Sequence, residues 1–240
     1  MKAVSCVHGT LSVIEMPAPK PTDGQLVVNV ASCGICGSDL HAKDHADEVR
    51  SNAEEMGYRD FMRSDTPVVM GHEFSGGEVA ERGRKTPKGF RVGTRVVSFP
   101  LVRGHGGVHL TGLSPLAPGG YAEQVLVQAA MTFAVPNGLS LDVAALTEPM
   151  AVALHAVRRS EIKKGDTAIV IGCGPVGLGG IICQLKKTLG VATIVASDFS
   201  PARRALAARC GAHIVVDPKV DSPYEQASKP LDAPASTRAV

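Results

Sequence analysis

The 240-residue chain has no tryptophan, few aromatic residues and no long apolar run. No stretch reaches the roughly 18 consecutive apolar residues of a membrane-spanning helix, and the N-terminal segment lacks the apolar core of a signal peptide. The net charge of +2 gives no basis for binding nucleic acid or an anionic membrane. The six cysteines are scattered and do not form a disulfide framework. We therefore expect a cytoplasmic protein with reduced thiols and neither nucleic-acid nor membrane partners.

The chain changes its sequence period near residue 140. Short β-branched segments bounded by glycine or proline predict strands over residues 25–30, 93–98 and 122–127. A polar segment at 43–65 interrupts this half and has partly helical character; it either lines an entrance or covers surface. The predicted fold class is therefore a β-rich domain over residues 1–150, followed by an α/β domain.

The second half predicts alternating strands and helices. Buried strands are expected at residues 167–172, 192–198 and 213–217, with helices between them. This β-α-β-α-β pattern is one half of a doubly wound Rossmann sheet, which we assign to residues 151–218. Residues 219–240 are rich in proline, serine and alanine, and we expect them to be a disordered tail.

A glycine-rich motif lies between the first of these strands and the following helix. Gly172 permits a tight turn, Gly174 lets the backbone approach a pyrophosphate, and Gly177 allows close helix packing. Asp198, about 20 residues on, is suited to accept hydrogen bonds from ribose hydroxyls. The predicted cofactor is NAD, although Arg203 and Arg204 leave NADP open. The predicted nucleotide site comprises Gly172, Gly174, Pro175, Val176, Gly177, Asp198 and Arg203.

The first half carries four residues of types that bind zinc: Cys36, His72, Glu73 and Glu148. Each also has an ordinary structural interpretation, as a buried thiol, a core imidazole or a surface acid. The segment "VVMGHEFSGGEV" places His72 and Glu73 directly after an apolar strand, which favours a functional pair. Asp39 is a suitable partner for the second nitrogen of His72.

The segment "CGICGSDLH" permits two interpretations. Cys33 and Cys36 have C-x-x-C spacing, as in redox or two-thiol zinc sites, but no second C-x-x-C completes such a site. The alternative unit is Cys36 with Ser38 and His41. Ser38 is either a helix cap or a catalytic hydroxyl, and His41 either a catalytic group or an exposed helical residue.

Five motifs together resemble one family. "CGSDLH", "GHEFSGGEV", "GGYAEQVLV", "TEPMAVALHAV" and "VIGCGPVGLGG" occur in the order seen in zinc-containing medium-chain alcohol and polyol dehydrogenases. The resemblance implies a GroES-like catalytic domain joined to a Rossmann domain, and an enzyme that oxidises a small-molecule alcohol or polyol with NAD. It also implies that Ser38 hydrogen-bonds the substrate oxygen and that His41 ends a proton relay.

The resemblance implies that Glu148 replaces the second cysteine ligand, as in the polyol branch of the family. Either Glu148 binds zinc directly and Glu73 exchanges for water, or the reverse, because adjacent strand residues point to opposite faces. The stretch corresponding to the family's structural zinc site has no cysteine, so we expect one catalytic zinc and no structural zinc. His105 and His109 are better explained as part of a glycine-rich loop.

The chain is also short beside that family. A complete member would continue for about 100 residues and add the second half of the nucleotide domain. The alternative function is therefore a truncated, non-catalytic fragment that binds zinc or nucleotide, or associates through an uncovered sheet edge. A zinc-free reductase of the same superfamily is a third hypothesis, which the ligand set disfavours. Assembly into a homo-oligomer stays open.

Overall fold

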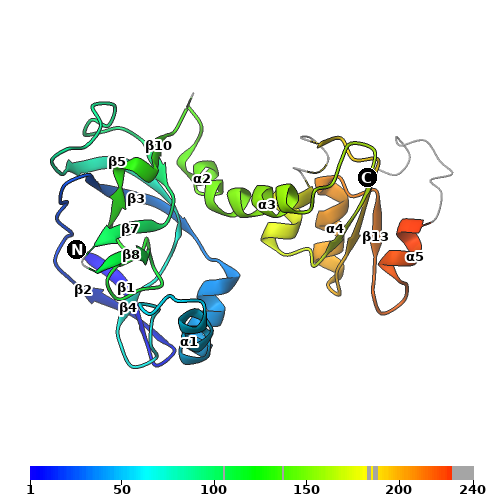
Figure 1. Cartoon of the computed structure of the whole chain (residues 1–240), viewed down its shortest axis with the longest axis horizontal. Coiled ribbons are helices and arrows are strands. Elements are labelled where there is room, and N and C mark those ends of the chain that lie inside the picture. Colours follow the sequence, from blue (N-terminus) through cyan, green and yellow to red (C-terminus); the bar gives the residue numbers. More distant parts are fainter. Residues whose placement is uncertain (105, 137, 183–184, 186–188, 229–240) are drawn as a thin grey trace. The chain divides into compact units, whose positions relative to one another are not determined.

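The chain divides into two units, Met1–Glu148 and Pro149–Val240 (Figure 1). The structure is a computed structural model that describes all residues except 105, 137, 183–184, 186–188 and 229–240. The division falls two residues before the domain boundary expected from the sequence. Each unit has its own hydrophobic core and is described separately.

A five-stranded sheet forms the centre of the first unit. Its strand order is β10 (Thr132–Ala134), β6 (Val96–Ser98), β5 (Glu73–Arg82), β3 (Gln25–Gly34) and β9 (Gln124–Gln128). Leu26, Val28 and Val79 are fully buried between these strands because the β-branched and aliphatic side chains face one core. The three strands predicted from the sequence are thus confirmed as β3, β6 and β9.

Smaller elements complete the first unit. A second sheet has the order β2 (Thr10–Glu15), β1 (Lys2–Val7), β4 (Val68–Val69), and β7 (Leu101–Gly104) forms a hairpin with β8 (Gly107–Leu110). A 3₁₀ turn, η1 (Ala129–Met131), precedes β10. Helix α2 (Leu141–Ala144) is capped by Ser140, whose side chain accepts a hydrogen bond from the Val143 N–H. Helix α3 (Thr147–Arg159) begins here, and its residues from Pro149 onward belong to the second unit.

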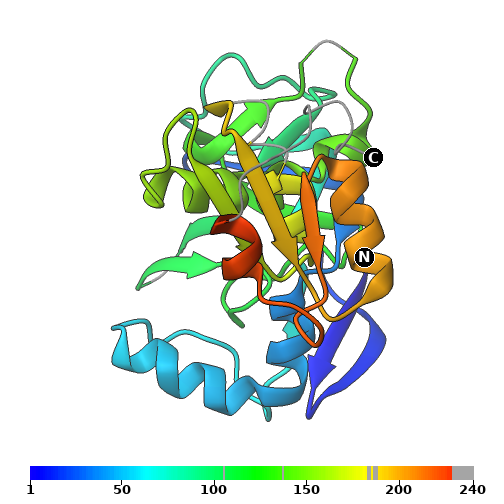
Figure 2. The ribbon, with the colours of Figure 1, turned by 90° about the vertical axis from the view of Figure 1, so that its right-hand side faces the viewer.

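The polar segment 43–65 belongs largely to helix α1 (Gly37–Glu55). Ala42, Ala46 and Ala53 on one face of α1 are buried in a cluster with Cys6 and Met70. The segment therefore contributes to a core and does more than cover surface. The helix bends at His45, whose backbone is non-helical (φ −132°, ψ 34°); the bend is visible in Figure 2.

The second unit contains the predicted β-α-β-α-β pattern. Strands β11 (Thr167–Ile171), β12 (Thr193–Ser197) and β13 (Ile214–Val216) are parallel and lie in that order. Helix η2 (Val176–Ile182) has wide, π-type turns, and α4 (Pro201–Cys210) connects β12 to β13. Ser200 caps α4 at its start and Gly211, with φ +106°, ends it, as predicted.

The prediction of a disordered tail is wrong for part of the segment. Residues 223–228 form helix α5 (Pro223–Ser228), which contacts β11 and β12. The contacts with these two strands give this otherwise polar segment a neighbour that the sequence alone did not reveal. The remainder of the predicted tail, residues 229–240, lies outside the described residues. Among the described helices, none is long and apolar enough to cross a membrane.

Candidate metal centre and nucleotide-binding loop

Three of the predicted zinc ligands come together in the first unit. One ligand atom each from Cys36, His72 and Glu73 lies within 4.8 Å of the other two. In the part of the chain that the structure describes, no other His, Cys, Asp or Glu residues form such a group of three. His72 and Glu73 are buried, with 7% and 8% of their surface exposed.

The backbone around Gly71 explains how two adjacent residues reach one site. β4 ends at Val69 and β5 begins at Glu73, so His72 lies in a break between strands. Gly71 has φ +95°, a conformation that other residues rarely adopt. The strand alternation that would separate His72 from Glu73 therefore does not apply. The register of β3 against β5 pairs Gly34 with Glu73, which brings Glu73 next to the segment that carries Cys36.

Asp39 connects the parts of this group. Its Oδ1 lies 3.1 Å from His72 Nδ1, and its Oδ2 accepts hydrogen bonds from the Cys36 N–H (3.0 Å) and the Tyr121 hydroxyl (2.8 Å). The predicted pairing of Asp39 with His72 is thus confirmed in its geometry. Tyr121 was missed by sequence reasoning, although it lies within the quoted motif "GGYAEQVLV".

The charges around His72 favour its protonated form when no metal is bound. Burial lowers the pKa of His72, but the contacts of its ring with the Asp39 carboxylate and the Cys36 side chain outweigh burial and raise this pKa to about 9. Burial likewise opposes ionisation of Asp39, yet His72 and the Cys36 N–H keep the pKa of Asp39 below its usual value. The group therefore carries negative charge. A bound cation can neutralise this charge in place of the proton on His72.

Ser38 lies beside the other nitrogen of His72, with Oγ 3.3 Å from Nε2. The capping alternative for Ser38 is wrong, because α1 begins at Gly37 and its cap position is Cys36. His41 is exposed one turn further along α1, and its ring lies 4.9 Å from that of His45. His41 is not part of the group of three.

Glu148, the fourth predicted ligand, lies outside the group of three. It is half-buried in the first turn of α3. Burial raises the pKa of Glu148; His72 opposes this shift, and Glu73 and Asp39 add to it. Of the two arrangements left open by the sequence, the geometry thus favours Glu73 beside Cys36 and His72.

The donor set fits zinc. A thiolate, an imidazole and a carboxylate are all zinc ligands, and three protein ligands leave the fourth position open in catalytic sites. One thiolate and one carboxylate also neutralise a divalent cation. The carboxylate of Asp39 at Nδ1 orients the imidazole so that Nε2 is the nitrogen available to a metal.

We expect zinc affinity to rise with pH up to about pH 9. His72 must lose a proton to bind zinc, and its pKa of about 9 means that protons compete below that value. His72 alone should release about one proton per zinc, so the logarithm of the affinity gains about one unit per pH unit. Zinc titrations against a competing chelator between pH 6 and pH 9 measure this slope. An affinity that does not change over this range would contradict the expectation.

The glycine-rich loop of the second unit has the geometry of a phosphate cradle. Gly172 adopts φ +88° at the end of β11. A Cβ at Gly177 would lie 2.1 Å from the Gly172 carbonyl oxygen, so the loop packs tightly against η2. A Cβ at Gly174 would meet nothing within 4 Å, which leaves space for a ligand to approach the backbone. Pro175 and Val176 stand at the start of η2. The loop therefore fits a nucleotide pyrophosphate.

The carboxylate of Asp198 is hydrogen-bonded to this loop. Its Oδ2 accepts a hydrogen bond from the Cys173 N–H and its Oδ1 from the Ser200 N–H, both at 2.7 Å. The carboxylate thus joins the glycine loop to the turn before α4. Arg203 lies 3.8 Å from Asp198 with 57% of its side chain exposed, whereas Arg204 is paired with Asp217 at 2.9 Å. Of the two arginines, Arg203 is the one available to a ligand.

Replacing Asp198 with alanine should weaken NAD binding by about tenfold or more, which corresponds to about 1.4 kcal/mol. The loss of acceptors leaves two backbone N–H groups without partners and loosens the loop. Fluorescence titration of NAD measures the effect. Asp217→Asn is the matched control, since Asp217 ends the next strand and pairs with Arg204. Equal NAD affinity in the Asp198→Ala variant and the natural chain would contradict this role.

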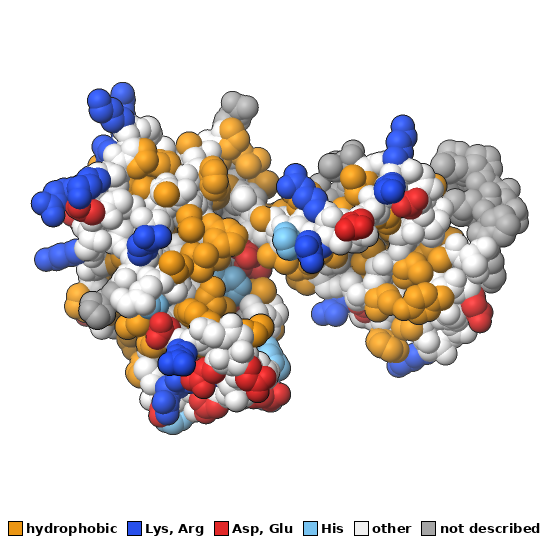
Figure 3. All heavy atoms as spheres, viewed as in Figure 1, with side chains coloured by type: hydrophobic (Ala, Val, Ile, Leu, Met, Phe, Trp, Pro, Cys, Tyr) orange, Lys and Arg blue, Asp and Glu red, His pale blue; other side chains and the backbone are white. Residues whose placement is uncertain are grey.

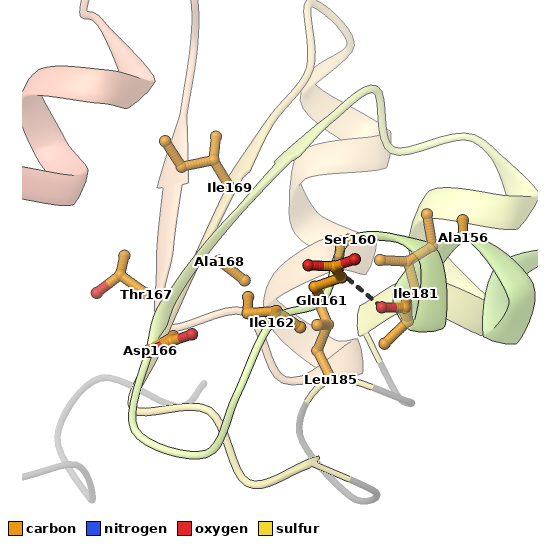
Figure 4. A pocket seen from close by; sticks show the side chains of 11 residues that line it. Ala156, Ser160, Glu161, Ile162, Asp166, Thr167, Ala168, Ile169, Ile181 and Leu185 are labelled. Carbon is orange, nitrogen blue, oxygen red and sulfur yellow. Dashed lines mark hydrogen bonds between the residues drawn. The ribbon is translucent and has the colours of Figure 1, made fainter.

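A cavity of about 620 Å³ in the second unit lies apart from these residues. Ser160, Glu161 and Asp166 line it together with apolar side chains of α3, β11 and η2, such as Ala156, Ile169 and Ile181 (Figure 4). None of the predicted site residues lines this cavity. Its size alone therefore does not make it the functional site.

Comparison with known proteins places the chain in a family. The alcohol dehydrogenase GroES-like domain matches residues 22–137. The chain is 41% identical to (R,R)-butanediol dehydrogenase of Bacillus subtilis over 217 residues, which cover 83% of this chain and 58% of the relative. The chain belongs to the medium-chain alcohol and polyol dehydrogenase family.

Other members of this family have similar sequences and structures. Sorbitol dehydrogenase of Bacillus subtilis is 30% identical, with 90% of this chain and 61% of the relative covered. The crystal structure of 2R,3R-butanediol dehydrogenase from Bacillus subtilis has a TM-score of 0.76 at 36% identity. The match covers 92% of this chain and 64% of that one. A zinc-binding dehydrogenase of Sinorhizobium meliloti bound to NADP has a TM-score of 0.79 at 30% identity. This match covers 96% of this chain and 65% of that one. The chain spans about three fifths of the length of these relatives.

Proposed function

We propose that the chain takes part in oxidising a small alcohol or polyol to a carbonyl compound, with NAD as hydride acceptor and one zinc ion at Cys36, His72 and Glu73. The main support for this proposal is the group of three ligand atoms, in which the His72 ring is held by the Asp39 carboxylate. The names of relatives, which include butanediol and sorbitol dehydrogenases, favour a substrate with more than one hydroxyl group.

A zinc ion in this group would act as a Lewis acid on the substrate oxygen, and NAD would accept the hydride. Ser38 is suited to hydrogen-bond that oxygen and to relay its proton, accepting it as the hydroxyl gives its own proton onward, because the hydroxyl lies beside His72 Nε2. His41, exposed one turn further along α1, would pass the proton to water. Asp39 holds His72 in one tautomer throughout.

We assign Glu73 as the third protein ligand and Glu148 as a group that exchanges with it. The charges of His72, Glu73 and Asp39 all affect the pKa of Glu148, which supports a position of Glu148 near the metal centre. In the second unit, Gly172, Gly174 and Gly177 would hold the pyrophosphate. Asp198 favours NAD over NADP because a carboxylate repels a 2′-phosphate. The exposed guanidinium of Arg203 supports NADP as the second candidate.

Three measurements on the purified chain test this proposal: zinc content by elemental analysis, NAD binding, and alcohol-dependent NADH formation. The substrate panel should include primary alcohols, secondary alcohols, vicinal diols and sugar alcohols. The proposal expects one zinc per chain and NADH formation with diols or polyols. Zinc and NAD binding without turnover on any substrate would instead support a non-catalytic binding function for this chain, which spans 58% of its butanediol dehydrogenase relative.

A further inference from the structure

The solvent face of α1 carries two histidines whose rings meet. The ring centroids of His41 and His45 lie 4.9 Å apart, with an angle of 38° between the ring planes. The two residues are four positions apart, and both are exposed. Their nitrogens are therefore accessible to an ion from solvent.

The bend in α1 occurs at this pair. His45 has non-helical backbone angles in the middle of the helix, yet no glycine or proline follows Gly37 within α1 to account for a bend. Ala42 and Ala46 anchor the opposite face in the core. The histidine rings therefore meet on a segment whose position is fixed by packing.

Acidic groups surround the histidine pair. Oε2 of Glu48 lies 3.8 Å from Nδ1 of His45, and Glu48 is itself exposed. Asp44 is adjacent and forms an ion pair with Lys43. Figure 3 shows acidic side chains gathered over α1, with histidines and fewer basic side chains among them. The potential on this face favours cations.

We propose that His41 and His45 form a second, weaker site for a divalent transition metal such as Zn²⁺ or Ni²⁺. Two histidines four residues apart on one helix face can bind the same ion, and imidazole is a preferred ligand for nickel, copper and zinc. Water molecules complete the coordination, and Glu48 is close enough to contribute a carboxylate oxygen. This site is separate from the group of Cys36, His72 and Glu73.

A functional consequence rests on the proposed function. A metal ion at His41 occupies one ring nitrogen, and an imidazole needs both nitrogens to accept a proton on one side and release it on the other, so the second site is inhibitory. Excess Zn²⁺ then lowers turnover, and His45→Ala restores it without changing turnover at low zinc.

The direct test is a calorimetric titration of Ni²⁺ into the full chain loaded with one equivalent of zinc. His41→Ala and His45→Ala should each weaken Ni²⁺ binding by about tenfold or more. His155→Ala is the matched control, because His155 is an exposed histidine on α3 whose ring contacts no other ring among the described residues, and its variant should bind as the natural chain does. Zinc retention and circular dichroism of each variant check that the centre and the fold are intact.

The outcomes separate the two proposals. Unchanged Ni²⁺ affinity in both the His41→Ala and the His45→Ala variants overturns the second site, whether or not the chain oxidises alcohols. Loss of binding in these two variants together with the absence of dehydrogenase activity establishes the site and removes the proposed function. Zinc inhibition that persists unchanged in the His45→Ala variant overturns the inhibitory role.

Discussion

Replacing Cys36 with alanine should abolish zinc retention and turnover and leave NAD binding intact. The substitution removes one of three protein ligands and half of the negative charge that neutralises the ion. Since the loss of even an outer partner of a ligand costs 10–100-fold in metal affinity, the loss of a ligand should cost at least about 100-fold. NAD binding should persist because the glycine loop belongs to the second unit.

Cys33→Ala is the matched control for this prediction. Cys33 lies three residues before Cys36, and burial raises its pKa to about 12, so it stays a neutral thiol packed beside Gly71 and Gly120. The Cys33→Ala variant should retain zinc, whereas a two-thiol C-x-x-C site would lose it. Elemental analysis of both variants after dialysis gives the answer. One equivalent of zinc in the Cys36→Ala variant would remove the proposed centre.

Replacing Gly119 with alanine should destabilise the first unit by about 3 kcal/mol or more. An added Cβ would lie 2.4 Å from the carbonyl oxygens of both Gly71 and Met70, and backbone cannot move aside as a flexible side chain can. The same stretch is hydrogen-bonded, since the Gly119 N–H donates to the Val69 carbonyl at 2.8 Å. Zinc affinity should fall as well, because a shift at Gly71 moves His72.

Thermal unfolding measures this effect, with an expected decrease in Tm of about 6–12 °C. Gly89→Ala is the control, because a Cβ at Gly89 would meet nothing within 4 Å and its backbone is not left-handed. A Gly119→Ala variant as stable as the Gly89→Ala variant would show that the backbone at Gly71 can rearrange at little cost.

The sequence predicted the main strands of both units, but it did not predict the bend of α1 or the presence of helix α5. Strands β3, β6 and β9 and the parallel strands of the second unit follow from short apolar segments, since the pattern and the packing agree there. The bend of α1 at His45 could not be predicted, because no glycine or proline marks it. Helix α5 was missed because its polar sequence gains stability from contacts with the sheet.

The metal centre was predictable in its residue types and not in its arrangement. Motif order and ligand chemistry indicated Cys36 and His72, but strand alternation left Glu73 and Glu148 as alternatives. The conformation of Gly71, which brings Glu73 to the group, depends on a tertiary fit with Tyr121 and Gly119. Tyr121 itself was missed because its hydrogen bond to Asp39 joins residues 82 positions apart.

The contacts of Asp39 couple metal release to the opening of a helix end. One carboxylate holds the first turn of α1 through the Cys36 N–H and, at the same time, holds the His72 ring. Fraying of that turn thus frees a ligand and its orienting partner in a single event. Amide hydrogen exchange at Cys36, Asp39 and Leu40, whose N–H groups are hydrogen-bonded in this turn, would then be slow in the zinc-loaded chain and fast in the metal-free chain, so the exchange rate of one helical turn would report how long the ion stays bound.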